Sequence, residues 1–272
     1  MNVMINGLPG NVAVMLASHI LADDRFELVP FSLTGPEITD PEHAVGGTAV
    51  ALVRPEDRDQ RIKEIKNRHG EFISVDFTHP TAVNENAGFY CANHLPFVMG
   101  TTGGDRQALV KTVEASGIAA VIAPNMGKQI VGFQAMLEFA AENFPGLFSG
   151  YALSVKESHQ NGKADTSGTA KAVVKSFNDL GIDFSTDRIE MVRDPEVQKR
   201  DWGIPPAYLG GHGWHTYALL SPDETVRFEF THNINGREVY AHGTLDALVF
   251  LDGKIKAGKT GQVYSMIDVL RG

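Results

Sequence analysis

Short apolar runs alternate with longer helical patterns over the first 125 residues of the chain. The apolar runs predict strands at 3–5, 26–31, 48–53, 72–77, 95–100 and 118–123. The stretches between them predict helices at 12–22, 56–68, 80–94 and 105–116. Strands that alternate with helices form a parallel sheet, and nearly continuous apolar strands are buried on both faces. This part of the chain therefore predicts a Rossmann-like, doubly wound α/β domain.

The pattern changes after Asn125. Helices are predicted at 130–144 and 167–181, and strands at 151–158, 214–220 and 225–233, with a Pro/Gly-rich stretch at 195–213. Neighbouring strands of this kind predict a second domain of α+β type with a mixed or antiparallel open sheet. A helix at 244–250 and a short C-terminal helix follow. We expect one domain from residues 1–126 with 238–272, and a second from 127–237.

Composition narrows the classes of protein that fit these domains. The 272 residues are 43% hydrophobic and 21% charged, as in soluble globular proteins. The net charge of −9, with no basic run longer than two residues, argues against binding to nucleic acid or an anionic membrane. Cys91 is the single cysteine, which excludes an internal disulfide and favours a reducing compartment. No apolar run has membrane-spanning length, and the chain enters a predicted strand at once, so we expect a cytoplasmic protein that acts on small molecules.

A glycine loop joins the first predicted strand to the first helix. The sequence MINGLPGNVA places Gly7, Gly10 and Ala13 in a G-x-x-G-x-x-A pattern. Glycines allow a tight turn and close approach to a pyrophosphate, and the helix start offers free N–H groups. Such turns also occur without a nucleotide, but the first βα turn of a doubly wound sheet favours a dinucleotide. Ser32 and Thr34 stand where an NAD enzyme usually has Asp or Glu, which favours NADPH and leaves NADH as the alternative.

The stretch VKESHQNGKADTSGTAKA carries the candidate chemistry. His159 and Lys163 are four residues apart, but the Asn161-Gly162 turn between them places both on a loop. The loop leads to a helix start at Ser167-Gly168-Thr169, where N–H groups and hydroxyls suit a carboxylate. Histidine exchanges protons near neutral pH, and lysine adds charge and can deliver a proton. Each residue also has an ordinary structural explanation, but together they predict a loop that binds an anion and donates a proton.

ESHQNGKADTSGTA resembles the E-x-H-H-x-x-K-x-D-x-P-S-G-T-A signature of the 4-hydroxy-tetrahydrodipicolinate reductases, also called dihydrodipicolinate reductases. The segments NGLPGNV, VDFTHP, MGTTG and APNM are similar to further motifs of that family. FEFTHNINGREVYAHGTLDA and YSMIDVL resemble its plant and cyanobacterial branch. In two respects the chain departs from the signature: Gln160 replaces the second His, and the motif is one residue shorter and lacks its Pro.

The resemblance implies a role for each matching residue. His159 would be the acid/base residue and Lys163 the proton donor. The implied substrate-binding residues are Gln160, Ser167, Gly168, Thr169 and Arg237. With Ser32 and Thr34, the implied cofactor-binding residues are Gly7, Leu8, Pro9, Gly10, Asn11, Val12, Phe77, Gly100, Thr101, Thr102, Ala123, Pro124, Asn125 and Met126.

The resemblance also implies the reaction and the assembly. NADPH or NADH would reduce 4-hydroxy-tetrahydrodipicolinate, a cyclic dicarboxylate, to tetrahydrodipicolinate in lysine and diaminopimelate biosynthesis. A cleft between the domains would close about hinges near 125–128 and 237–242, and the second domain would form a homotetramer. Two alternatives stay open at this stage. One is another two-domain NAD(P) oxidoreductase that acts on an amino acid or semialdehyde, and the other is a non-catalytic dinucleotide-responsive sensor.

Other candidate residues have weaker patterns. The spacing of His212, His215, His232 and His242 matches no compact zinc motif, so we expect no metal site. His79 follows a strand end and would touch the dinucleotide or lie on the surface. Asp76 is expected to order its loop, and Cys91 to lie in the core.

Overall fold

The computed structural model describes residues 1–272, which form two compact units. The first comprises Met1–Lys128 and Tyr240–Gly272, and the second Gln129–Val239. The boundaries expected from the sequence lie within two residues of these limits. Among the helices, none combines the length and apolar character needed to cross a membrane.

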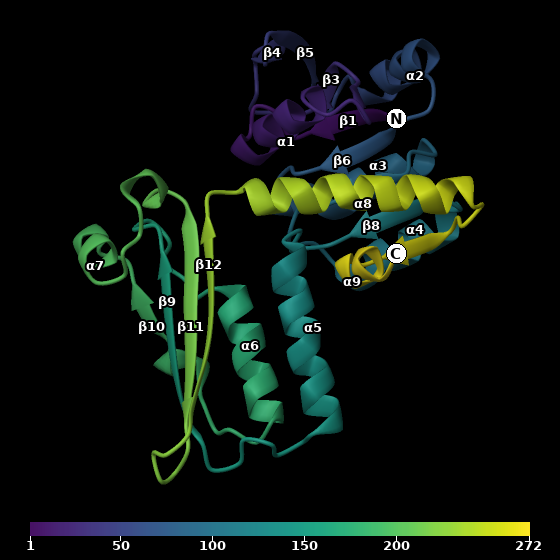
Figure 1. The fold of residues 1–272 in the computed structure, drawn as a ribbon. Coiled ribbons are helices and arrows are strands. Elements are labelled where there is room, and N and C mark those ends of the chain that lie inside the picture. The colour runs from purple at the N-terminus through teal and green to yellow at the C-terminus, as the bar shows by residue number, and fades with distance from the viewer. The chain divides into compact units, whose positions relative to one another are not determined.

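The first unit is built on a six-stranded sheet in the order β13-β8-β7-β6-β1-β2, and every neighbouring pair is parallel. Its strands are β1 (Asn2–Asn6), β2 (Glu27–Leu28), β6 (Ile73–Asp76), β7 (Phe97–Met99), β8 (Ala119–Ile122) and β13 (Gln262–Tyr264). Its helices are α1 (Asn11–Leu21), α2 (Arg58–His69), the 3₁₀ turn η1 (Pro80–Ala82), α3 (Val83–Ala92), α4 (Arg106–Ser116), α8 (Glu238–Lys256) and α9 (Met266–Arg271). In Figure 1, α8 crosses in front of this sheet and α3 and α4 lie behind it. The predicted doubly wound α/β fold is confirmed.

A smaller three-stranded sheet in the same unit departs from the prediction. The run 26–31 is not one strand: β2 pairs with β1, whereas β3 (Phe31–Leu33) pairs with β5 (Thr48–Val53) in a separate sheet. Pro30 lies between β2 and β3 and has no N–H to donate to a continuous ladder, which explains the break. The third strand of this sheet is β4 (Glu42–Val45), which the apolar pattern missed because only Val45 of its four residues is buried.

Helix α8 is longer than the predicted 244–250. It begins with an acidic first turn at Glu238 and ends with Lys254 and Lys256, charges that suit the two ends of the helix dipole. Gly243 weakens the helical pattern in the sequence, but a Cβ at this position would collide with the carbonyl of Met126. The glycine therefore allows the close approach of helix and chain.

The second unit contains a mixed sheet in the order β10-β9-β11-β12. Its strands are β9 (Ala152–His159), β10 (Glu190–Val192), β11 (His212–Leu220) and β12 (Arg227–Asn235). Only β9 and β10 are parallel, so the predicted mixed sheet is confirmed. The helices are α5 (Lys128–Asn143), α6 (Gly168–Asp179) and α7 (Pro195–Arg200), with 3₁₀ turns η2 (Thr186–Arg188) and η3 (Pro206–Tyr208).

Helices α5 and α6 cover one face of the mixed sheet, as Figure 1 shows. The alternation of buried and exposed positions along β9 and β11 turns Val155 and Tyr217 toward this face. They pack with Phe177 of α6 and Leu137 of α5 in one hydrophobic cluster. At the end of β9 and the start of β11, polar residues occupy the same alternating positions and form the candidate site.

Candidate active site

The glycine loop in the first unit has the conformation that its sequence predicts. Gly7 has a φ of +108°, and a Cβ there would collide with the carbonyl of Phe77. The N–H of Gly10 donates to the carbonyl of Gly7 at 2.8 Å, which closes the turn before α1. No side chain caps the start of this helix, so its first N–H groups are available to an anion.

A cavity of about 920 Å³ opens beside this loop. Its volume lies in the range of ordinary ligand and cofactor sites. Of the residues predicted to bind the cofactor, it is lined by Gly7, Leu8, Pro9, Gly10, Thr34 and Phe77. The others lie outside its lining, namely Asn11, Val12, Ser32, Gly100, Thr101, Thr102, Ala123, Pro124, Asn125 and Met126.

The side chains of Ser32 and Thr34 form hydrogen bonds with the backbone of the glycine loop. Ser32 is fully buried, and its hydroxyl accepts the N–H of Leu8 at 3.1 Å. The Thr34 hydroxyl donates to the carbonyl of the same Leu8 at 2.7 Å. Ser32 therefore shapes the loop instead of facing a ribose, which differs from its predicted role.

Asp76 orders the chain at the carboxyl end of β6, as expected. Its buried carboxylate accepts hydrogen bonds from the hydroxyls of Thr101 at 2.5 Å, Tyr90 at 2.7 Å and Thr78 at 3.0 Å. The amide of Asn86 donates to it at 3.0 Å. Burial and the Asp76 charge raise the pKa of Tyr90 well above its usual value, so these donors are neutral.

No pattern in the sequence predicts charged residues in this cavity. Arg58, Glu37 and Glu85 line it together with His79. Arg58 donates to the Glu85 carboxylate at 2.5 Å and lies 4.8 Å from the centre of the Phe89 ring. Arg58 is the first residue of α2, which the sequence predicts only as a polar, solvated helix. The position of Arg58 in the cavity is therefore known only from the folded structure.

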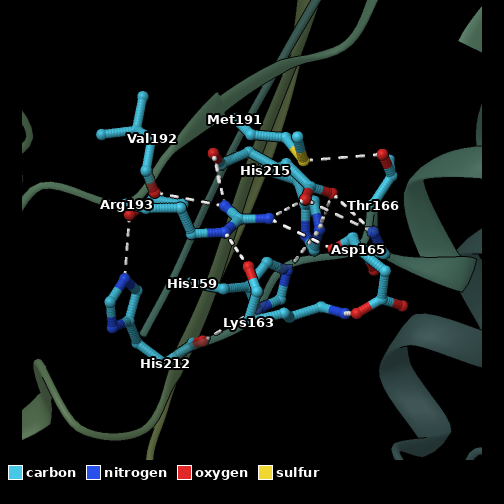
Figure 2. A network of polar contacts seen from close by, with 12 residues as sticks. His159, Lys163, Asp165, Thr166, Met191, Val192, Arg193, His212 and His215 are labelled. Atoms are coloured by element: carbon cyan, nitrogen blue, oxygen red, sulfur yellow. Dashed lines mark hydrogen bonds and ion pairs between the residues drawn. The ribbon is translucent and has the colours of Figure 1, made fainter. Parts of the chain in front are cut away.

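In the second unit, strand register brings the catalytic candidates together. His159 ends β9 and pairs with Gly213 of β11, and Glu157 pairs with His215. A Cβ at Gly213 would lie 3.1 Å from Cε1 of His159, so the glycine makes room for the imidazole. Figure 2 shows His159 and His215 close to the guanidinium of Arg193.

Glu157 is a fully buried carboxylate held by charged and polar donors. Arg193 donates to it at 2.5 Å, the N–H of Ser167 at 3.0 Å, and Nε2 of His215 lies 3.7 Å away. Burial alone would raise its pKa, but the contacts with His215, Arg193 and Ser167 prevail and lower that pKa to about 2. Glu157 is therefore an anion at neutral pH.

Both ring nitrogens of His159 have partners inside the unit. Nδ1 lies 3.0 Å from the carbonyl of His212, and Nε2 lies 3.3 Å from Nε2 of His215. Burial, followed by the neighbouring His215, lowers the pKa of His159 to about 4, and the attraction of Glu157 opposes this only in part. His159 is therefore neutral at neutral pH.

Lys163 lies on the loop between β9 and α6. Its N–H donates to the carbonyl of Gln160 at 3.0 Å, and its carbonyl accepts from Arg193 at 2.8 Å. Its ammonium contacts only the exposed Asp165, at 2.7 Å. Because this pairing is at the surface, the ammonium can exchange Asp165 for a substrate group at small cost.

The start of α6 supplies N–H groups beside this loop. The N–H of Ser167 is used by Glu157, so it does not serve a ligand as the sequence suggested. A Cβ at Gly168 would meet no atom within 4 Å, so the space at this helix start is open. The N–H groups of Gly168 and Thr169 lie in the first turn, where helices leave donors unpaired.

Arg237 follows β12 at the same end of the sheet. The last residue of that strand, Asn235, pairs with His212, whose neighbour Gly213 pairs with His159. Arg237 is exposed and lies two residues beyond Asn235. It is thus placed near the loop that carries the candidate residues.

Comparison with known proteins assigns both units to one family. The N-terminal domain of dihydrodipicolinate reductase matches residues 1–126, and its C-terminal domain matches residues 130–270. The chain belongs to the dihydrodipicolinate reductase family. It is therefore an NAD(P)H-dependent oxidoreductase, as predicted, and its cofactor is a nicotinamide dinucleotide.

Relatives within the dihydrodipicolinate reductase family place the chain near the plant proteins. It is 46% identical to 4-hydroxy-tetrahydrodipicolinate reductase 1, chloroplastic, of Arabidopsis thaliana, covering 99% of this chain and 78% of the relative. It is 31% identical to the reductase of Janthinobacterium sp., with 93% of each chain covered. The structure of dipicolinate-bound dihydrodipicolinate reductase from Paenisporosarcina sp. TG-14 has the same fold, with a TM-score of 0.68 at 18% identity over 97% of both chains.

Several residues of the candidate site were missed from the sequence. Glu157 is part of the family signature but was assigned no role there. Its place in the signature was the one feature of the sequence that could have identified it as a site residue. Arg193, His215 and the buried Gln198 carry no local pattern. Gln198 donates to the carbonyl of His159 at 2.7 Å and so fixes the end of β9.

The histidines considered as metal ligands are used differently. Potential ligand atoms of Glu157, His159 and His215 all lie within 4.8 Å of one another. The carboxylate of this group is already bound by Arg193 and Ser167, and the guanidinium repels a cation. His212 contacts the Ser158 hydroxyl at 2.9 Å, and His242 belongs to the first unit.

Proposed function

We propose that this reductase converts 4-hydroxy-tetrahydrodipicolinate to tetrahydrodipicolinate in the diaminopimelate route to lysine. In the net reaction, the hydroxyl and one ring hydrogen leave as water, and a hydride from the nicotinamide and one proton are added to the ring. The observation that carries the proposal is the loop of the second unit, where the weakly paired ammonium of Lys163 stands beside the open start of α6. The name shared by relatives 46% and 31% identical supports the same substrate.

Each carboxylate of the substrate has a candidate partner. One would accept the N–H groups of Gly168 and Thr169, aided by the positive end of α6. The exposed guanidinium of Arg237 would bind the other. Gln160 would offer a neutral amide in place of the imidazole that the family signature has there.

The two catalytic candidates would act in different protonation states. Lys163 is the cation of the loop and would donate the proton to the reduced ring. His159 is neutral because burial holds its pKa at about 4, so it would accept a proton before it could donate one. This division gives the site one acid and one base at neutral pH.

The cavity of the first unit would hold the dinucleotide. The pyrophosphate would lie against Gly7–Gly10 and the start of α1. Arg58 lines the cavity and supports the expected preference for NADPH, because a guanidinium suits a 2′-phosphate. Glu37 lines it as well, but it is exposed and can turn to solvent.

The function is tested by following NAD(P)H oxidation with substrate generated in situ. Wild-type turnover is expected with the cyclic dicarboxylate and not with amino-acid or semialdehyde substrates. Turnover at background level would refute the proposal. A cofactor titration with and without pyridine-2,6-dicarboxylate, a planar analogue, should show that each ligand tightens binding of the other.

Assembly and location are part of the proposal. Trp214 of β11 and Trp202, which follows α7, line a surface hollow at the mixed sheet, and we propose that this unit forms the homotetramer. The acidic charge and the single, buried cysteine support a cytoplasmic location. Mass photometry tests the first point, and fractionation of the source cells tests the second.

A further inference from the structure

A row of titratable side chains crosses the inner face of the mixed sheet beneath the catalytic loop. Glu157 of β9 pairs with His215 of β11, which in turn pairs with His232 of β12. The rings of the two histidines are 4.5 Å apart. His215 is 3% exposed, so its contacts are made within the protein.

The contacts of His159 decide where its proton lies. A backbone carbonyl can only accept, so Nδ1 must carry the hydrogen in the contact with His212. In the neutral ring, Nε2 then has the lone pair. Any proton that His159 takes or gives must therefore pass through Nε2.

That atom is occupied by His215. The two Nε2 atoms are 3.3 Å apart, so His215 must donate its Nε2–H to the lone pair of His159. Nε2 of His215 also lies 3.7 Å from the carboxylate of Glu157, which favours a hydrogen on this nitrogen. Nδ1 of His215 is buried without a hydrogen-bond partner, so no contact of this atom competes for the hydrogen on Nε2.

We propose that His215, held by Glu157, is a positioning residue that controls Nε2 of His159, so that the two imidazoles act as one unit with a single exchangeable proton. The Nε2 hydrogen can move across the 3.3 Å contact to His159, so a proton taken up by the pair changes the charge of the two rings together. Two protonated rings would place two N–H groups against each other, so the pair holds one positive charge. This inference rests on the proposed function, because it assigns His215 the positioning of His159, the proposed base of that reaction.

The surroundings of the pair support a single charge. The titratable and charged groups that face it are Glu157 on β9, Arg193 after β10, His212 and Tyr217 on β11, and His232 on β12. Glu157 is the one anion among them, and Arg193 already neutralises it. Burial and the nearby histidines lower the pKa of His232 to about 4, so it adds no charge at neutral pH.

Two substitutions separate the parts of this role. His215→Gln keeps an N–H donor at the place of Nε2 but cannot take up a proton. His215→Leu fills similar space and removes both functions. We expect His215→Leu to lower kcat on the order of ten-fold or more, with little change in the KM for substrate, and His215→Gln to recover part of that loss. NADPH affinity should stay unchanged in both, since the cofactor cavity belongs to the first unit.

A measurement without substrate tests the pair directly. In ¹⁵N-histidine NMR spectra of the wild-type protein, His159 should carry its hydrogen on Nδ1, and the pair should take up one proton on acidification. The His159 titration should move to higher pH in His215→Leu and less so in His215→Gln. A hydrogen on Nε2 of wild-type His159, or the same His159 titration in all three proteins, would overturn the inference.

Failure of the inference is distinguishable from failure of the proposed function. Wild-type protein that does not reduce the dicarboxylate refutes the function, and its NMR titration still tests the pair. Wild-type turnover with unchanged kinetics and pH profile in His215→Leu refutes the pair alone. The wild-type titration needs no variant, so a variant that fails to fold leaves the test intact.

Discussion

The two units each bury one carboxylate at the end of a β-strand, and they stabilise it by different means. Asp76 ends β6 and accepts hydrogen bonds from neutral hydroxyls and an amide. Glu157, near the end of β9, is held by Arg193, the N–H of Ser167 and His215. Neutral donors with high pKa values fix geometry over a wide pH range, whereas histidines couple geometry to protonation. The first unit is thus suited to hold a cofactor, and the second to move a proton.

The largest effect is expected from Lys163→Ala, which removes the proposed proton donor of the second unit. It should lower kcat on the order of a hundred-fold, because general acid catalysis is worth at least that much. NADPH affinity by calorimetry should stay the same. Lys163→Arg keeps the charge but cannot donate a proton, so it should be as slow as the alanine variant. Lys175→Ala, on the exposed side of α6, is the matched control and should behave as wild type.

Asp76→Asn should destabilise the first unit, because it changes the buried acceptor at the end of β6. The amide cannot accept from all the donors that surround Asp76, so one or more buried donors lose their partner. We expect a loss of about 1–3 kcal/mol in the free energy of unfolding, measured with urea. The pH dependence of kcat should not move. A shifted pH profile would show that the first unit also takes part in proton transfer.

Acid should weaken the second unit through its histidines. Their folded-state pKa values are lowered to about 4 at His159 and His232, below the usual 6.5. The unfolded chain then binds more protons, so stability is lost as pH falls from about 6.5 to about 4. The lowered pKa of Glu157 adds a further loss only between about 4.5 and 2.

His232→Phe sharpens this prediction. Both ring nitrogens of His232 are buried without partners, and its ring lies against Phe133, so phenylalanine fits the surroundings. The variant should lose less stability than wild type between pH 7 and pH 4, as thermal melts at the two pH values would show. Equal losses would mean that His232 does not titrate in this range.

A smaller effect is expected from Arg58→Ala in the cavity that we propose for the cofactor. It should raise the KM for NADPH a few-fold, about 1 kcal/mol, and leave the KM for NADH nearly unchanged. Glu37→Gln should have the smaller effect on NADPH because its side chain is exposed. Equal changes for both cofactors would show that Arg58 does not contact the 2′-phosphate.

Much of the architecture could be predicted because it depends on local patterns. The apolar runs of β1, β6, β7 and β8 and the turn at Gly7 are each written in a few consecutive residues. The prediction of one strand at 26–31 was wrong, because an apolar pattern does not show which sheet a short strand joins. Strand β4, in which only Val45 is buried, had no apolar pattern to detect.

By itself, the sequence determined the doubly wound fold, the family and the loop with His159, Lys163 and Gly168, because each depends on residues close together in the chain. Only the tertiary structure decided what surrounds that loop. Arg193 reaches Glu157 across 36 positions and His215 reaches His159 across 56, through the register of three strands. Burial and contacts over such separations set the protonation of these groups, and neither is encoded in any short stretch of sequence.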